Sequence, residues 1–169
     1  MAMTSYGWWT VLHGFVLGLV FLWAFAGGLM NLGTLGHEWT PPELAQVLRR
    51  LKIKVWIVAV SAWLMVITGT YISYVPYRAK GPASPKSKVL AVADLAWLHN
   101  FAMEWKEHIA WAAPLLATAV VFIVTSYGAG LAARSDLRRA AMVFLVLSFV
   151  SSVVGSVLGF LIYKAVPIL

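Results

Sequence analysis

The 169-residue chain has no cysteine, and only 11% of its residues are charged. The lack of cysteine excludes disulfides, thiolate metal sites, iron–sulfur clusters and covalently attached haem. The scarcity of charge excludes a water-soluble fold, because soluble domains carry charge on about a quarter of their residues. With 62% hydrophobic residues and a mean hydropathy of +0.84, the composition predicts an integral membrane protein.

Acidic residues are few as well, with six Asp and Glu against 13 Lys and Arg, so the net charge is +7. Such a balance can indicate a nucleic-acid partner. Here the basic residues lie in short segments between apolar runs, where they set membrane topology, so we expect no nucleic acid. No basic residue precedes the first apolar run, which is long enough to span a bilayer, so we expect a retained helix rather than a signal peptide.

Four apolar runs are long enough to cross a lipid bilayer as helices. They cover about residues 8–32, 53–74, 108–127 and 140–163. Short connections between consecutive runs favour an all-α fold, a four-helix up-and-down bundle that forms one transmembrane domain over residues 1–169. Residues 89–101 predict a short helical segment before the third span, either at the membrane interface or continuous with that span.

Two further local signals bear on the helices. Thr40 precedes two prolines, and this order predicts that a helix starts there and leads into the second span. In the last span, Ser151, Gly155 and Gly159 recur at four-residue spacing, which favours close helix packing and leaves room for a flat ring.

The distribution of Lys and Arg bears on orientation. The two sides of the predicted bundle carry seven and six basic residues, which is almost a tie. No basic residue precedes the first span and four follow it, so the positive-inside rule places both termini outside. We therefore expect an integral protein of a bacterial inner membrane with extracytoplasmic termini.

Two histidines fall at similar depth near one predicted face. His13 lies about five residues into the first span and His108 at the start of the third, and these spans run in the same direction. Ionisable groups in membrane segments usually serve a function, and His binds haem iron without Cys. His13 and His108 are therefore the first candidate axial ligands of a haem b. His99 competes for one position, since nine residues place it about 180° from His108 around a helix.

Other residues expected at this face suit the rim of a haem pocket. Arg78 and Lys80 are positioned to neutralise propionates, and Tyr74 is expected to line the pocket. Glu104 lies one helical turn before His108 and is placed to accept its free N–H. The alternative is that Glu104, Lys106 and the neighbouring aromatic residues only anchor helices at the membrane interface.

This arrangement resembles small four-helix membrane cytochromes b and the related His-bearing copper-tolerance membrane proteins. The resemblance covers the bundle as a whole and is carried by His13 in LHGFVLG and His108 in EWKEHIAW. The common dihaem arrangement of such cytochromes has four histidines, two near each face. This chain departs from that pattern, because it has buried candidates near the outer face alone, so we do not expect a second haem at the inner face.

The sequence thus predicts a membrane-anchored electron-transfer subunit that holds one haem b near the extracytoplasmic face. It would not be a complete enzyme but would work with other membrane subunits, a redox partner protein and a further carrier, for which quinone is a candidate. The alternative is a cofactor-free structural subunit that stabilises a multi-subunit membrane complex through helix packing. A third hypothesis is copper handling by His99, Met103 and His108.

Overall fold

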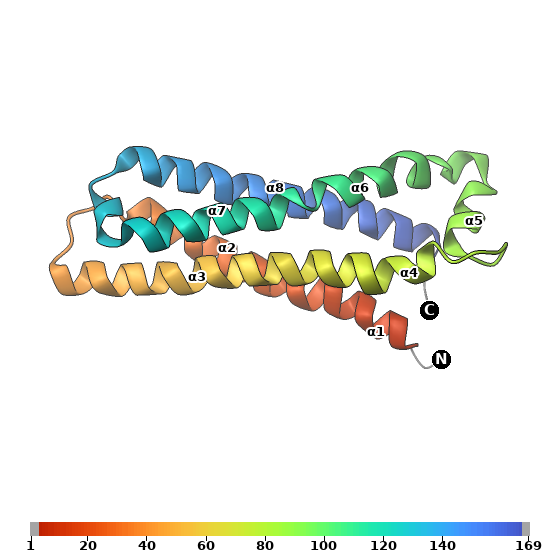
Figure 1. Ribbon diagram of the computed structural model, residues 1–169, viewed down its shortest axis with the longest axis horizontal. Helices are drawn as coiled ribbons and strands as arrows, with labels where there is room; N and C mark the ends of the chain where they lie inside the picture. Colours follow the sequence, from red (N-terminus) through yellow and green to blue (C-terminus); the bar gives the residue numbers. More distant parts are fainter. Residues whose placement is uncertain (1–3, 167–169) are drawn as a thin grey trace.

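The structure is a computed structural model that describes residues 4–166, whose regular structure is entirely helical. Four long helices lie side by side along the long axis of the molecule (Figure 1). They cover Ser5–Thr34, Pro41–Tyr77, Ala93–Ala132 and Ser135–Ala165, and each is long and apolar enough to cross a membrane. The predicted all-α class and its four candidate spans are therefore confirmed, and each predicted span lies within one helix.

Shorter segments make up these long helices. The first helix consists of α1 (Ser5–Val11), the π-helical η1 (Leu12–Val16) and α2 (Leu17–Thr34). The second consists of α3 (Pro41–Thr68), the π-helical η2 (Gly69–Ser73) and α4 (Tyr74–Tyr77). The third consists of η3 (Ala93–Leu95), the π-helical η4 (Leu98–Met103), α6 (Glu104–Ile109), α7 (Ala112–Tyr127) and η5 (Gly128–Ala132). The fourth is α8 (Ser135–Ala165), and the short α5 (Pro85–Leu90) precedes the third.

The local sequence explains where the second helix begins. Two prolines occupy the first positions of α3, and the backbone N–H of Thr40 donates a hydrogen bond to the Glu43 carboxylate over 2.9 Å. Helix N–H groups in the first turn lack acceptors within the helix, and the Glu43 carboxylate supplies an acceptor for the N–H of Thr40, just before that turn. α3 then continues into the second span, as predicted. The segment before the third span is also helical, and η4 runs directly into α6.

The main apolar core lies at one end of the molecule, which we call the hairpin end. There residues 35–40 and 133–134 connect consecutive helices (Figure 1). All four helices contact their neighbours at this end, because α2 packs on α3 and α8, and α7 packs on the same two helices. The buried side chains include Phe21, Leu51, Val55, Val124 and Leu145.

Packing changes at the opposite end, which we call the N-terminal end. There α1 contacts η2, while η4 and α6 contact α8. At this end of the described chain the helices therefore form two pairs, the first with the second and the third with the fourth, whereas at the hairpin end α3 packs on α7 and α2 on α8. A smaller apolar cluster fills this end, made of Tyr77, Val89, Leu98, Ala102, Met103 and Ile162.

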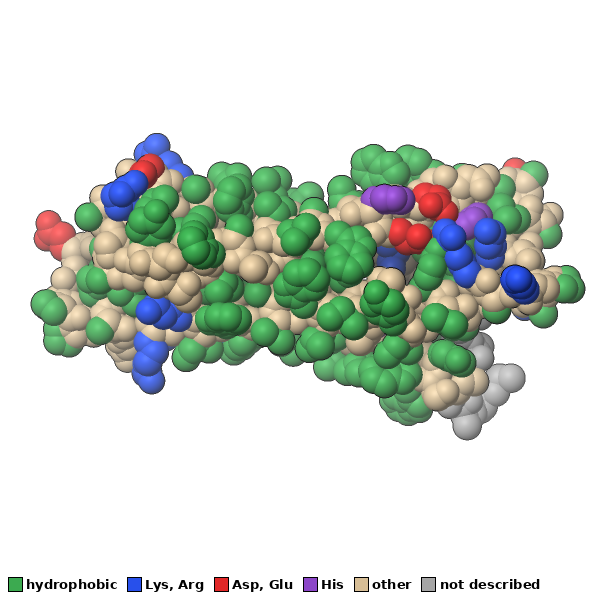
Figure 2. Space-filling model, viewed as in Figure 1, with side chains coloured by type: hydrophobic (Ala, Val, Ile, Leu, Met, Phe, Trp, Pro, Cys, Tyr) green, Lys and Arg blue, Asp and Glu red, His purple; other side chains and the backbone are tan. Residues whose placement is uncertain are grey.

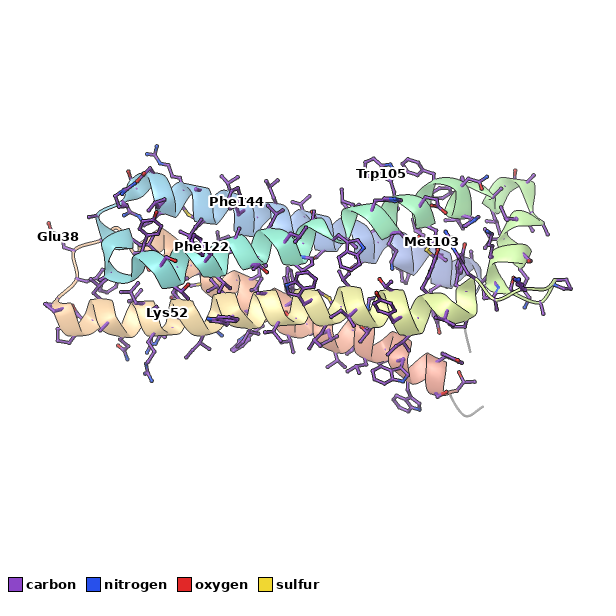
Figure 3. The ribbon with its side chains drawn as sticks, in the orientation of Figure 1. Glu38, Lys52, Met103, Trp105, Phe122 and Phe144 are labelled. Carbon is purple, nitrogen blue, oxygen red and sulfur yellow. The ribbon has the colours of Figure 1, made fainter. Side chains whose placement is uncertain are left out.

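The surface is apolar along most of the length of the molecule. Hydrophobic side chains cover the middle of the visible face, and charged side chains gather toward the two ends (Figure 2). Trp23, Phe122 and Phe160 are each at least 60% exposed. Trp105 points outward from the third helix while Met103 points inward (Figure 3). This surface is compatible with an integral membrane protein.

Candidate cofactor site

His13 lies in η1, where the first helix meets the second. Its Nδ1 is 3.1 Å from the Thr68 hydroxyl oxygen, and the Thr68 hydroxyl donates its proton to the Leu64 carbonyl over 2.6 Å. Because Thr68 bonds the Leu64 and Met65 carbonyls of its own helix, its oxygen can accept from His13 in the tautomer that carries its proton on Nδ1. In that tautomer the lone pair lies on Nε2, the form that binds a metal ion.

Gly69 makes room for the His13 ring. A Cβ atom at Gly69 would lie 2.8 Å from the His13 Cε1 and 3.3 Å from its Nε2, and the first distance is closer than real Cβ contacts allow. The imidazole therefore rests on the backbone of the second helix at the first residue of η2. A larger residue at this position would push the ring away.

Lys106 repeats this relationship in the other helix pair. A Cβ atom at Gly159 of α8 would lie 2.8 Å from the Lys106 Cε, so the lysine side chain of the third helix rests on a glycine of the fourth. Among residues 4–166 the Lys106 ammonium has no hydrogen-bond or ion-pair partner. An imidazole of one helix pair and an amine of the other thus each lie against a glycine.

A second polar cluster lies nearer the N-terminal end. His99 of η4 is 7% exposed and Tyr77 is 1% exposed, and their ring centroids are 5.9 Å apart. The Tyr74 ring stacks 6.3 Å from that of Tyr77. Four buried atoms here lack a hydrogen-bond partner within the described part of the chain. They are the Ser73 Oγ, the Tyr74 and Tyr77 hydroxyl oxygens and the His99 Nδ1.

These unpartnered atoms are energetically unfavourable. A buried donor or acceptor without a partner costs about 1–3 kcal/mol, and native proteins contain few of them. Four of the five such atoms within residues 4–166 fall in one cluster. Their concentration marks a place where water or a polar ligand would complete the hydrogen bonding.

Charged residues form the rim of this cluster. Arg78 pairs with Glu104 at 2.7 Å and with Glu107 at 3.4 Å, and its guanidinium carbon lies 4.8 Å from the centroid of the Tyr74 ring. Arg78 was expected to meet a propionate, and here it meets two carboxylates. Lys80, the other predicted propionate partner, is exposed.

The structure does not bring His108 to the interior with His13. His108 is exposed, and its Nδ1 lies 2.6 Å from the Glu104 carbonyl oxygen one turn earlier. Its predicted partner, the Glu104 carboxylate, binds Arg78 instead. His99 is buried while His108 is exposed, and the π-helical η4 lies between them, so a regular nine-residue count does not describe the angle that separates them.

Lys106 was predicted to be an interfacial residue, and the π-helical segments were not predicted. All three such segments of the described chain lie toward the N-terminal end, and two of them contain His13 and His99. Single π-helical turns are frequent at functional sites. The sequence offered one sign that Lys106 packs between helices, namely Gly159 of the last span, on which its side chain lies.

The copper hypothesis has less geometric support. Across residues 4–166 no group of three or more His, Asp or Glu side chains is arranged to hold a metal ion. His99 and Met103 are buried, but His108, their predicted partner, is exposed.

No protein-family model, curated protein or solved structure matches this chain. Its function is therefore inferred from the geometry of the site and from the chemistry of the residues there.

Proposed function

We propose that the protein is a membrane-anchored electron-transfer subunit that holds one haem b between its two helix pairs. It would be inserted in a bacterial inner membrane as an up-and-down bundle, with the N-terminal end outside. The observation that carries this proposal is the pairing of His13 with Thr68 and Gly69, which presents Nε2 in the ligand form at the N-terminal end of the bundle.

The residues present fit a haem. His13 would supply one axial ligand, since its other ring nitrogen is already held by Thr68. Gly69 and Gly159 give the His13 and Lys106 side chains room to lie against a neighbouring helix, because Cβ atoms at these positions would collide with them. When bound, the haem would supply one-electron redox chemistry, and the protein would hold, orient and shield it.

Lys106 would take the second axial position as a neutral amine, because its side chain extends from the other helix pair and lies against Gly159 of α8. His99 belongs to the cluster nearer the end, and His108 is exposed.

The remaining predicted residues take supporting roles in this proposal. Tyr74, beside Arg78, would line the wall of the site. Lys80 lies exposed at the rim, where it would neutralise a propionate, and Arg78 would do so only after leaving Glu104 and Glu107. Other membrane subunits and a redox partner protein would complete the electron path, so the chain alone is not a complete enzyme.

The structural-subunit alternative has a weaker basis in the fold. The small-residue stripe of α8 is used within the chain itself, because Ser151 and Gly155 are buried and Lys106 covers Gly159. The stripe is therefore not a free surface for a partner helix. Exposed aromatic residues such as Trp8 and Trp23 remain available for lipid or another subunit.

A reduced-minus-oxidised absorption spectrum of the purified chain, with haem extraction, tests the proposal. We expect a b-type α-band and one haem per chain. His13→Ala should abolish the band, whereas His37→Ala, which changes an exposed residue at the hairpin end, should leave it intact. A flat spectrum from a folded preparation that retains its native partners would reject the haem and favour the structural alternative.

A further inference from the structure

We propose that Tyr74, Tyr77 and His99 form a binding site for the head group of a membrane para-quinone or its quinol. This inference rests on the proposed electron-transfer function, because it assigns a place to the carrier that would exchange electrons with the haem. It concerns binding, which can be measured whether or not haem is present.

The hydrogen-bonding groups of the cluster match such a head group. The two phenolic hydroxyls and the His99 Nδ1 are buried and have no partner within residues 4–166. A hydroxyl can donate to a quinone carbonyl or accept from a quinol hydroxyl, and an imidazole nitrogen can do either according to its tautomer. The site can therefore bind both redox forms of the same ring.

The cluster is also rich in aromatic rings, which favour a flat ligand. The Tyr74 and Tyr77 rings are inclined by only 20° to each other, and the His99 ring lies at 51° to that of Tyr77. Aromatic faces favour offset stacking with another planar ring. Leu98 and Met103 lie in the same buried cluster and provide apolar contacts for ring substituents.

The surrounding charges favour a neutral ligand over an anion or a metal ion. Two cations, Lys86 and Arg78, and two carboxylates, Glu104 and Glu107, act on His99. Their formal charges cancel. Because Arg78 already pairs with both carboxylates, the rim presents neither a free cationic fork for phosphate nor a free carboxylate pair for a metal.

The position of the cluster separates it from His13. Tyr77 follows Gly69 by eight residues, which corresponds to about 12 Å along a helix. The quinone site would thus lie nearer the N-terminal end than the haem. On the adjacent outer surface Phe101 and Trp105 stack at 5.4 Å and are about half exposed, so an apolar tail would have a hydrophobic surface to follow.

Isothermal titration with decylubiquinone tests this proposal, using the purified full chain in nanodiscs freed of endogenous quinone. We expect saturable binding near one equivalent per chain. Tyr77→Phe combined with His99→Asn should weaken it at least tenfold. Tyr71→Phe should leave it unchanged, because Tyr71 lies on the same helix but is 69% exposed.

Thermal unfolding of the quinone-free protein provides a second readout. Tyr77→Phe removes an unpartnered hydroxyl, so it should raise the unfolding temperature while lowering quinone affinity. A residue with only a packing role would not produce these opposite signs. Equal affinity of the wild type, the double variant and Tyr71→Phe would overturn the proposal, and so would uptake that does not saturate.

The haem spectrum of the same samples separates the two proposals. A wild-type chain that shows the α-band but binds no quinone would overturn the quinone site and leave the haem proposal standing. Saturable quinone binding in a chain without haem would support the quinone site while rejecting the proposed cofactor.

Discussion

The Nδ1 of His13 lies 3.1 Å from the Thr68 hydroxyl oxygen, and this contact joins the first long helix to the second. Because Thr68 bonds the Leu64 and Met65 carbonyls of its own helix, its oxygen is placed to accept from the Nδ1–H tautomer of His13, which leaves Nε2 as the ligand atom. The contact thus orients the imidazole before any cofactor binds.

Thr68→Val tests this relationship. The variant keeps the side-chain volume but removes the hydroxyl that accepts from Nδ1, so we expect haem affinity to fall about 10–100-fold, as for other lost partners of a metal-binding histidine. Haem titration into apoprotein measures the effect. Thr125→Val is the matched control, because Thr125 is exposed and its hydroxyl bonds the Val121 carbonyl in the same way. Equal losses in both variants would contradict the role of Thr68.

Gly69→Ala should displace the His13 ring. The added Cβ would lie 2.8 Å from Cε1, so the ring or the backbone of η2 must move. We expect the free energy of unfolding to fall by about 1–3 kcal/mol, and haem binding to weaken with it. Gly18→Ala is the control, because its Cβ would meet no atom within 4 Å. Both quantities would remain at wild-type values if the ring does not rest on Gly69.

Lys106→Leu should change the coordination of the iron without abolishing haem binding. Loss of an axial amine would leave a five-coordinate iron, so we expect a high-spin ferrous spectrum and new binding of carbon monoxide. Lys88→Leu, at an exposed position, should leave the spectrum unchanged. If Lys106→Leu keeps a low-spin spectrum while His99→Asn loses it, then His99 is the second ligand.

Arg78→Gln should affect stability only slightly. The side chains of Arg78 and Glu104 are 38% and 43% exposed. Exposed ion pairs contribute at most about 1 kcal/mol to the free energy of unfolding. Chemical denaturation should therefore show a change below that size. Arg134→Gln, which breaks an exposed pair with Asp136 at the hairpin end, is the control. A loss of several kcal/mol in Arg78→Gln alone would mean that this rim supports the fold as well as the site.

The helix class and the number of candidate spans could be predicted from the sequence because they depend on composition along short stretches. In a membrane a long apolar run forms a helix because its backbone groups must pair with one another. Thr40 and the two prolines after it begin α3 through local geometry alone. The absence of cysteine likewise excluded whole classes of site without any knowledge of the fold. His13 was singled out on the same basis, as an ionisable residue within an apolar run.

The residues that meet across the helices were decided by tertiary structure. A regular helical count does not include π-helical turns such as η2 and η4, which change the direction of the residues that follow. Composition alone also could not show that His108 is exposed or that Lys106 lies against Gly159. The cluster of Tyr77 and His99 joins the end of one helix to the start of the next, so only the packing of the two could reveal its unpartnered atoms.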